Sequence, residues 1–269
     1  MNENYGKLSA SEIRDHSTGL GRMRTLLGYY MVLQGISVLV LFLTVLALYE
    51  EEFAVKLLTF IIEHNTVTMI LAVFSAGIAI LYYAEMLSLH RFETGLLAAG
   101  ALGLASFLYG NTGNTLTEAF SISGFLTKDY YSTIVTHSFI VLIIEYVFRR
   151  TYCMTMARRT DAFSSETSWK WGRLWNLTRK VYLGAAIAIV LLRAIIEHLT
   201  KSDESDYYFA SSENYTTAIA IAIGIAALCA VVNMVLQYRE RECLKSTIDS
   251  VYSAGSAPSS DEQPYGTGM

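Results

Sequence analysis

The sequence predicts an all-α polytopic membrane protein: a bundle of six transmembrane helices with one membrane-surface helix on the cytoplasmic side. Three observations lead to this prediction. The 269 residues are 53% apolar and only 16% charged, whereas soluble domains are about 25% charged. Six apolar stretches are each long enough to cross a bilayer, which takes about 20 helical residues. Lysine and arginine are also distributed unevenly between the segments that connect these stretches.

The first predicted span covers residues 25–49. It is apolar on every side from Ile36 to Leu48, whereas a soluble amphipathic helix would carry polar residues at the helical period of about 3.6. The stretch is also longer than the apolar region of a cleavable signal peptide, so we expect it to remain as a membrane anchor.

The remaining predicted spans are 66–89, 94–110, 131–148, 181–199 and 215–237. The third is the shortest and is rich in Gly and Ala, and its Gly100 and Gly103 predict close helix packing. A stripe of small residues from Ala218 to Ala230 predicts the same for the sixth span, either within the chain or in an oligomer.

The charge distribution predicts that both termini are cytoplasmic. Sixteen of the 20 lysines and arginines fall in the N-terminal segment, the second and fourth connecting segments and the C-terminal tail. Cytoplasmic segments of membrane proteins carry this excess of positive charge. The predicted organisation is therefore a cytoplasmic segment over 1–24, a transmembrane domain over 25–240 and a disordered cytoplasmic tail over 241–269, which is rich in Ser and Gly.

The longest cytoplasmic connection, residues 149–180, contains all three tryptophans: Trp169, Trp171 and Trp175. They alternate with Lys170 and Arg173. Tryptophan favours the headgroup level of a bilayer and basic residues favour anionic lipid. We therefore expect a helix over 168–179 that lies on the inner membrane surface with the tryptophans as anchors. The alternative is a loop packed on the helix ends.

Ionisable residues inside the predicted spans are candidate functional residues because charge in hydrocarbon is costly. An outer group contains His137, Arg193 and Glu197, which His64 could join, and His198 follows at the interface. An inner group contains Glu85 and Glu145, with Arg91, Arg149 or Arg150 as expected partners. The two groups could form an ion or proton pathway, but only Gln34 and Ser75 offer polar side chains between them. The favoured interpretation is structural ion pairs that fix the register of the helices, with long side chains reaching the interface.

Several kinds of chemistry lack a sequence signal. The net charge of −4 excludes a basic nucleic-acid-binding protein. The chain has no His-Glu-x-x-His or Cys-x-x-Cys metal motif, no nucleophile elbow and no phosphate-binding glycine loop. We therefore expect neither a cofactor nor a metal. A metal site assembled across helices from His64, His137, His198 and Glu197 is the remaining alternative.

Part of the C-terminal half resembles a known family. The sequence Ile144-Glu145-Tyr146-Val147-Phe148-Arg149 is followed by a basic segment, Leu192-Arg193-Ala194-Ile195-Ile196, an acidic segment and a last span ending Gln237-Tyr238-Arg239. Over residues 139–241 this order resembles the phosphate-starvation-inducible E family of small bacterial and archaeal membrane proteins. Family members have about four spans rather than six. The resemblance implies a stress-responsive membrane protein without established chemistry.

The function that we expect is that of a non-enzymatic, multi-pass protein of the cell membrane. It would be a structural, regulatory or stress-sensing component whose cytoplasmic face contacts the lipid bilayer and a protein partner or a second copy. The first alternative is a small channel or transporter that uses the intramembrane Glu, Arg and His residues. The second alternative is a membrane-embedded, metal-dependent enzyme.

Overall fold

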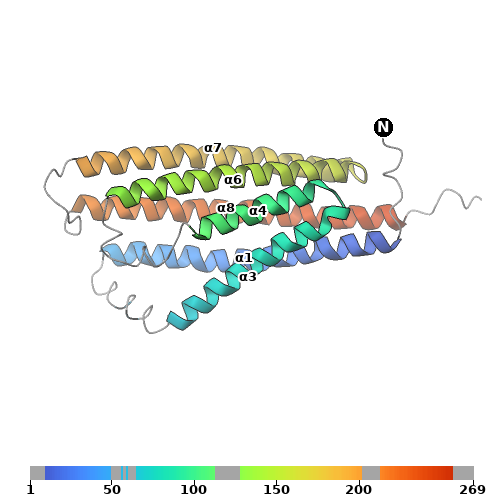
Figure 1. The fold of residues 1–269 in the computed structure, drawn as a ribbon, viewed down its shortest axis with the longest axis horizontal. Coiled ribbons are helices and arrows are strands. Elements are labelled where there is room, and N and C mark those ends of the chain that lie inside the picture. The colour runs from blue at the N-terminus through green and yellow to red at the C-terminus, as the bar shows by residue number, and fades with distance from the viewer. Residues whose placement is uncertain are drawn as a thin grey trace, which may run out of the picture.

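The computed structural model describes residues 10–49, 56, 59, 65–112, 128–201 and 213–256. These residues form an all-α fold without strands, as the sequence predicts. The helices are α1 (Ala10–Tyr49), α3 (Asn65–Ser88), α4 (Gly95–Thr112), α6 (Lys128–Asp161), α7 (Ser165–Lys201) and α8 (Glu213–Ser256) (Figure 1). A short 3-10 turn, Leu89–Arg91, joins α3 to α4.

Four long helices, α1, α6, α7 and α8, run lengthwise through the molecule (Figure 1). Helix α1 packs on α8, and α7 packs on both α6 and α8. Helix α3 contacts α1 near its C-terminal end and diverges from it toward Asn65, while α4 packs between α3 and α6. The start of α1 and the end of α8 lie at the same end of the bundle.

Four helices continue well beyond the predicted spans, and α1 already begins at Ala10. Helix α6 extends to Asp161, and α7 begins at Ser165 and runs without a break to Lys201. The prediction of a separate surface helix over 168–179 is therefore wrong, because these residues form the first part of α7. The prediction of a disordered tail is wrong for residues 241–256, which are helical in α8; residues 257–269 lie outside the described part.

The reason for these extensions is an amphipathic pattern that a search for uniformly apolar stretches misses. In α8 the buried positions include Leu236, Glu240, Leu244, Thr247 and Val251, which recur every three or four residues. This is the period of a helix with one buried face. The pattern includes polar residues, so it does not read as a membrane span.

Helix α7 starts where a serine caps it. The backbone N–H of Phe163 and Ser164 both donate to the carbonyl oxygen of Thr160, which closes the turn after α6. The Ser164 hydroxyl then accepts a hydrogen bond from the backbone N–H of Thr167 at 3.3 Å. A side-chain oxygen in this position satisfies one of the unpaired N–H groups at a helix start. The turn therefore reverses the direction of the chain, and α6 and α7 form a helical hairpin.

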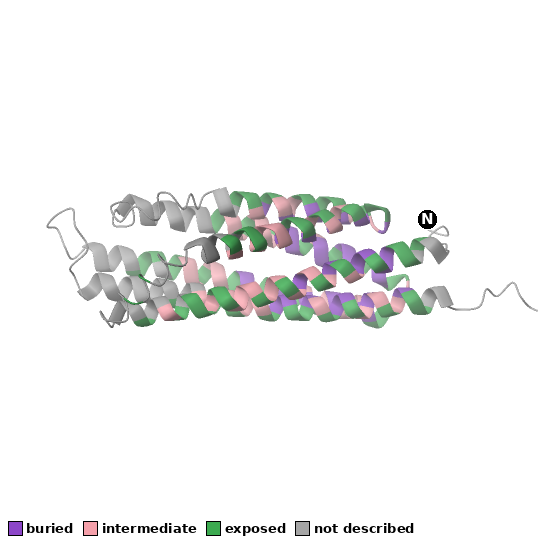
Figure 2. Cartoon of the chain, turned by 90° about the horizontal axis from the view of Figure 1, so that it is seen from below, coloured by how far each residue is buried: buried purple, intermediate pink, exposed green. Residues whose placement is uncertain are grey.

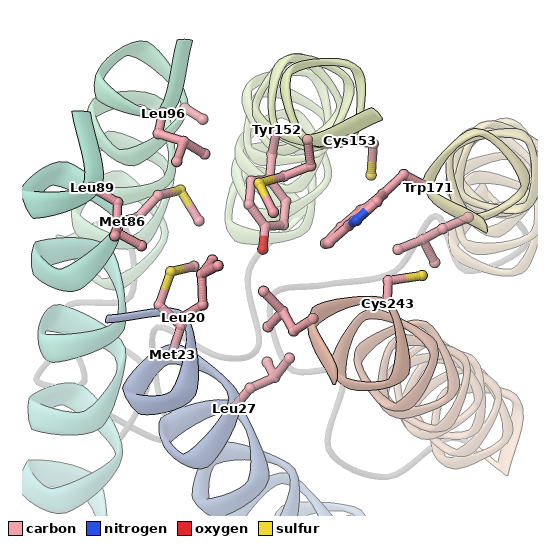
Figure 3. Close-up of a cluster of buried hydrophobic side chains, with 14 of the residues drawn as sticks. Leu20, Met23, Leu27, Met86, Leu89, Leu96, Tyr152, Cys153, Trp171 and Cys243 are labelled. Atoms are coloured by element: carbon pink, nitrogen blue, oxygen red, sulfur yellow. The ribbon is translucent and has the colours of Figure 1, made fainter. Parts of the chain in front are cut away.

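One half of the bundle has a packed core. We call it the core half, and it consists of residues 10–27, 82–103, 148–182 and 236–256. Its fully buried side chains include Leu20, Met23, Met86, Tyr152 and Trp171, from four different helices (Figure 3). Burying a large apolar side chain contributes about 1.5–3 kcal/mol. The indole N–H of Trp171 is also satisfied, since it donates to the Thr247 hydroxyl at 2.9 Å.

The rest of the described helices form what we call the apolar half, where large apolar side chains point outward. Val32, Phe42, Val73, Leu183 and Val190 are each more than half exposed. Figure 2 shows that the buried residues gather toward the end of the bundle that carries the N-terminus, whereas exposed and intermediate residues predominate along the middle. A soluble monomer rarely exposes large apolar side chains in such numbers along neighbouring helices.

Two stretches of the described helices, Arg14–Val40 and Val73–Arg91, are long and apolar enough to cross a membrane. Only 11% and 22% of their most apolar windows are buried, unlike the core helix of a soluble protein. Two such helices are by themselves weak support for a membrane protein.

Glycines bring α4 close to its neighbours. A Cβ atom at Gly95 would overlap the Thr155 side chain, and one at Gly103 would overlap the Tyr83 ring. A Cβ atom at Gly100 would lie 2.9 Å from Leu87 Cγ. The predicted role of Gly100 and Gly103 in close helix packing is confirmed.

Candidate functional site

The core half and the apolar half meet at a layer of polar side chains contributed by five helices. We call this set the polar layer, and its members are Arg22, Tyr82, Glu85, Glu145, Arg149, Tyr182 and Glu240. Hydrogen bonds and ion pairs connect most of its members to one another. We take it as the candidate functional site because burying charged groups costs free energy, and the side chains of Arg149 and Glu240 are buried here.

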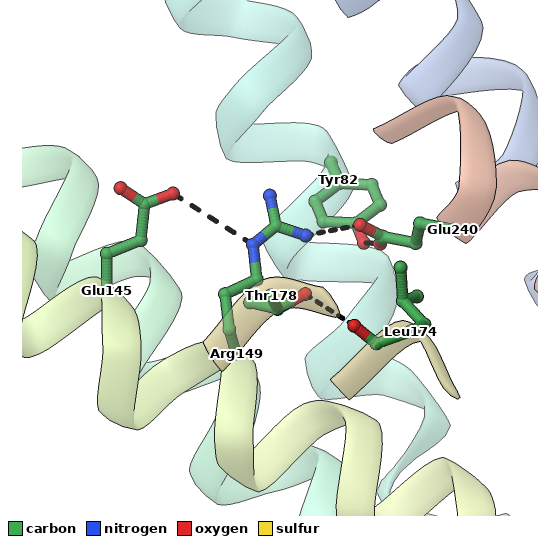
Figure 4. Close-up of polar contacts among 6 residues, drawn as sticks. All are labelled: Tyr82, Glu145, Arg149, Leu174, Thr178 and Glu240. Carbon is green, nitrogen blue, oxygen red and sulfur yellow. Dashed lines mark hydrogen bonds and ion pairs between the residues drawn. The ribbon is translucent and has the colours of Figure 1, made fainter. Parts of the chain in front are cut away.

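The centre of the layer is a buried ion pair between Arg149 of α6 and Glu240 of α8 (Figure 4). Their side chains are 10% and 1% exposed, respectively. One Glu240 oxygen accepts from Arg149 Nη1, and the other accepts from the Tyr82 hydroxyl of α3. A buried charge needs such compensation, because its desolvation costs several kcal/mol. The pair therefore fixes three helices relative to one another.

A second carboxylate faces the same guanidinium. Glu145 lies one turn before Arg149 on α6, with its Oε1 atom 3.9 Å from Arg149 Nε, and its side chain is 30% exposed. Tyr182 of α7 lies beside both groups. Two carboxylates thus share one arginine, and the cluster carries one excess negative charge when both are ionised.

Aromatic rings cover the layer on its core side. The Arg149 guanidinium lies 5.3 Å from the centroid of the Phe148 ring. Phe148 stacks on Tyr152 at 6.0 Å, and Tyr152 meets Trp171 edge-on at 5.3 Å. These rings exclude water from the ion pair, and the resulting low local dielectric strengthens its electrostatic attraction.

Burial and the charge of Glu240 both shift the pKa of groups on the core side of the layer. Burial and then Glu240 raise the pKa of the Tyr152 hydroxyl well above its ordinary value. The same two causes raise the pKa of Cys243 to about 12 and also raise the pKa of Cys153. Both cysteines are free thiols. They stay protonated at neutral pH and are therefore weak nucleophiles.

A further ion pair of the layer joins α1 to α3. Arg22 Nη1 lies 2.8 Å from Glu85 Oε1, and the two side chains are 62% and 19% exposed. The sequence predicted Arg91, Arg149 or Arg150 as partners of the inner carboxylates. Arg149 is indeed beside Glu145, but Glu85 pairs with Arg22, which is far away in sequence and comes from another helix.

The outer group of candidate residues is not brought to this layer. Arg193 lies on the exposed surface of α7 in the apolar half. His137 belongs to α6, and Glu197 and His198 belong to α7. The side chains of these last three residues lie outside the described part of the structure.

The three tryptophans have different environments. Trp171 is fully buried in the core half, so its prediction as a membrane-surface anchor is wrong. The reason is helical periodicity, because Thr167, Trp171 and Leu174 share the buried face of α7. Trp175 is half-buried against the Tyr146 ring at 5.3 Å. Trp169 is 60% exposed, with the Arg173 guanidinium 4.6 Å above its ring.

Sequence reasoning missed Glu240 and Tyr82. Glu240 lies just beyond the last predicted span, 215–237, and Tyr82 lies within the second predicted span, 66–89, where nothing in the sequence singles either residue out. The spacing of the buried positions in α8 is the signal that places Glu240 on an inward face.

The described side chains include no group of three His, Cys, Asp or Glu residues that could hold a metal ion. The cross-helix metal site considered above uses His64, His137, Glu197 and His198, whose side chains lie outside the described part. No protein-family model, curated protein or solved structure matches the chain. The resemblance to the phosphate-starvation-inducible E family stays a prediction.

Proposed function

We propose that the protein is a multi-pass protein of the cell membrane whose helices continue from the bilayer into a cytoplasmic helical bundle. It acts as a structural or signal-transmitting component rather than as an enzyme. The observation that carries this proposal is the reversal of burial along single helices: apolar side chains point outward on one side of the polar layer and inward on the other. Lipid would cover the apolar half, and water would surround the core half.

Helix lengths support a membrane around the apolar half. Beyond the polar layer, α7 continues from Tyr182 to Lys201 and α6 covers Lys128 to Phe148. At a rise of 1.5 Å per residue these segments are about 29 and 30 Å long. The hydrocarbon core of a bilayer is about 30 Å thick. The polar layer would then lie at the inner edge of the membrane.

The alternating direction of the six helices favours six crossings, but the third crossing is the shortest. Gly103 packs against Tyr83 and Phe148 at the level of the polar layer. Only the segment from Leu104 to Thr112 of α4 lies beyond it, which is about 14 Å of helix. The described part of α4 is therefore too short to support a third crossing by itself, and residues 113–127 lie outside the described part.

Charge supports a cytoplasmic location of the core half and of both chain ends. The core half contains the basic residues of α6, the first part of α7 and the end of α8, among them Arg150, Arg158, Lys170, Arg179 and Lys245. Positively charged segments next to membrane spans remain in the cytoplasm.

The continuity of the helices supports signal transmission. Helices α1, α6, α7 and α8 pass through the polar layer without interruption. A shift or rotation of a helix in the bilayer would therefore be carried directly into the cytoplasmic bundle, and the ion pairs of the layer would resist changes in register. This arrangement fits a sensing or regulatory component, as the resemblance to a stress-responsive family implies.

The exposed Trp169 supports a protein partner. In α7 it lies 13 residues before Tyr182, which places it about 20 Å outside the polar layer. The headgroup region is only about 5–8 Å deep on each side of the hydrocarbon. Trp169 and Arg173 would thus lie beyond reach of the lipid, where an aromatic and basic pair is typical of protein contacts.

Two measurements test the proposal. Single cysteines replace Arg173 and Val190 in a cysteine-free chain and are reacted in intact cells with a membrane-impermeant maleimide. We expect Arg173→Cys to react only after the cells are opened and Val190→Cys to stay unlabelled in both cases. Labelling of Val190→Cys from the water would contradict a membrane around the apolar half.

A flux assay separates the leading proposal from a transport function. The excess carboxylate of the polar layer, Glu145, is the observation that favours a proton or cation pathway. We expect liposomes containing folded wild-type protein to leak no faster than empty liposomes. Proton or cation flux that falls in Glu145→Gln would replace the structural proposal with a channel or transporter.

A further inference from the structure

An open groove lies between α1 and α3, where α3 begins to diverge from α1 (Figure 1). Its volume is about 770 Å³, and its wall includes Gly21, Arg22 and Arg24 of α1 and Leu81 and Glu85 of α3. The groove therefore begins at the polar layer and lies beside the surface that lipid would cover.

The two helices give the groove a polar end and an apolar end. They run in opposite directions, so Thr18 of α1 lies toward the same end as Ser88 of α3, and Leu26 lies toward the same end as Leu81. The first end faces the core half. The second end opens toward the apolar half, where Leu81 is 55% exposed. A molecule with an anionic head and an apolar tail fits this order.

The charge of the groove favours an anion. Arg22 and Arg24 outweigh the single carboxylate of Glu85. Arg22 is 62% exposed even though it pairs with Glu85, and it can turn toward a ligand. Arg24 also lines the groove and forms no ion pair with a carboxylate among the described residues, so its guanidinium charge is left to attract a phosphate.

The hydroxyl groups that line the groove already donate hydrogen bonds within their own helices. Thr18, Thr25 and Ser88 donate to backbone carbonyl oxygens of Arg14, Gly21 and Glu85 in their own helices. Their protons are therefore already used. The guanidinium groups are the donors that remain, and guanidinium is well suited to phosphate because its parallel N–H groups match two phosphate oxygens.

We propose that this groove binds an anionic phospholipid of the inner leaflet, with its phosphate between Arg22 and Arg24 and its acyl chains along Leu26 and Leu81. The inference rests on the proposed membrane location of the apolar half. Sites for small molecules have volumes of about 300–1,000 Å³, so the groove holds the headgroup and the start of the chains, and the remaining chain lies along the outside of α1 and α3.

The test is lipid retention by the full chain. Delipidated protein in detergent is titrated with phosphatidylglycerol or phosphatidylcholine, and bound lipid is counted by native mass spectrometry. We expect preferential binding of phosphatidylglycerol. Replacing both arginines (Arg22→Gln with Arg24→Gln) should weaken it about 25-fold, since each basic residue near anionic lipid contributes roughly a fivefold factor. Glu85→Gln should strengthen it, because it frees Arg22.

A matched glycine pair tests the position of the site. A Cβ atom at Gly21 or at Gly172 meets nothing within 4 Å, and both glycines are half-buried in long helices. Gly21→Leu fills the groove, whereas Gly172→Leu lies on α7, away from it. We expect only Gly21→Leu to lose phosphatidylglycerol, with both variants as thermostable as the wild type. Equal losses in the two variants would overturn the assignment.

Three other results would also overturn the lipid site: equal retention of the two lipids, unchanged retention in the arginine variant, or full displacement by millimolar inorganic phosphate, which would indicate a site for the free ion.

Carbonate extraction of cell membranes distinguishes failure of the lipid site from failure of the proposed function. Wild-type protein that stays in the membrane but shows no lipid preference contradicts only the lipid site. Protein released by carbonate contradicts the membrane location as well.

Discussion

Removing the carboxylate of Glu240 should destabilise the protein more than any change to its surface charges. In Glu240→Leu the Arg149 guanidinium, with its side chain only 10% exposed, loses the partner that compensates its burial. The Tyr82 hydroxyl loses its acceptor in the same step. Breaking a buried ion pair from one side costs about 3–5 kcal/mol. Glu145 remains 3.9 Å from Arg149 Nε, so we expect a loss near the lower end, about 3 kcal/mol.

Thermal unfolding in detergent at a fixed heating rate measures this loss. For a chain of this size about 3 kcal/mol corresponds to a decrease in Tm of roughly 6–12 °C. Adding Arg149→Met should recover most of the decrease, because replacing both ions with apolar side chains is often neutral. Glu166→Gln is the control, since it removes an exposed ion pair with Lys170 at 2.8 Å and should leave Tm unchanged. A decrease below about 2 °C in Glu240→Leu, or a further decrease in the double variant, would refute the reasoning.

Three further predictions follow from the core half. In a Cys229→Ser background, Cys153 and Cys243 should react with a maleimide only after denaturation, because burial raises the pKa of both thiols; rapid reaction of the folded protein would contradict their burial. Trp171→Phe should cost about 1–3 kcal/mol, since it leaves a cavity and removes the hydrogen bond to Thr247, whereas Trp169→Phe should leave Tm unchanged. Burial and then Arg159 lower the pKa of His16 below its ordinary value of 6.5, so the unfolded chain binds more protons below that pH. Tm should therefore fall on acidification from pH 7 through this range, and an equally steep fall in His16→Gln would exclude His16 as the cause.

The helices whose bounds the sequence predicted accurately are those that read as uniformly apolar. The bounds predicted for the second and third spans, 66–89 and 94–110, agree closely with those of α3 at Asn65–Ser88 and α4 at Gly95–Thr112. Uniform apolarity is a local property, so a short window of sequence suffices to detect it.

The parts of the core half that come from α7 and α8 were not predicted, because these helices are held there by tertiary contacts between amphipathic faces. Trp171 looks like an interfacial residue when it is read beside Lys170 and Arg173, and only its packing against Tyr152 and Thr247 shows its role. Most of the stability of such helices comes from packing rather than from local propensity.

The same distinction applies to the candidate site. The pairing of Glu145 with Arg149 could be predicted, because the two residues are four apart on one helix. Glu240 and Arg22 come from distant parts of the chain, and their partners depend on how α8 and α1 pack. Without the spatial arrangement of the helices, no spacing rule connects them to the inner carboxylates.

The most direct test of the central claim is a depth profile along α7 in a lipid bilayer. Spin labels at the exposed positions Trp169, Arg173, Leu183, Ile187 and Val190 are compared for relaxation by oxygen, which concentrates in lipid, and by a water-soluble nickel complex. If the polar layer marks the membrane edge, the first two positions are accessible to nickel and the last three to oxygen, with the change near Tyr182. Nickel access along the whole helix, or a change placed near Trp169, would contradict the account.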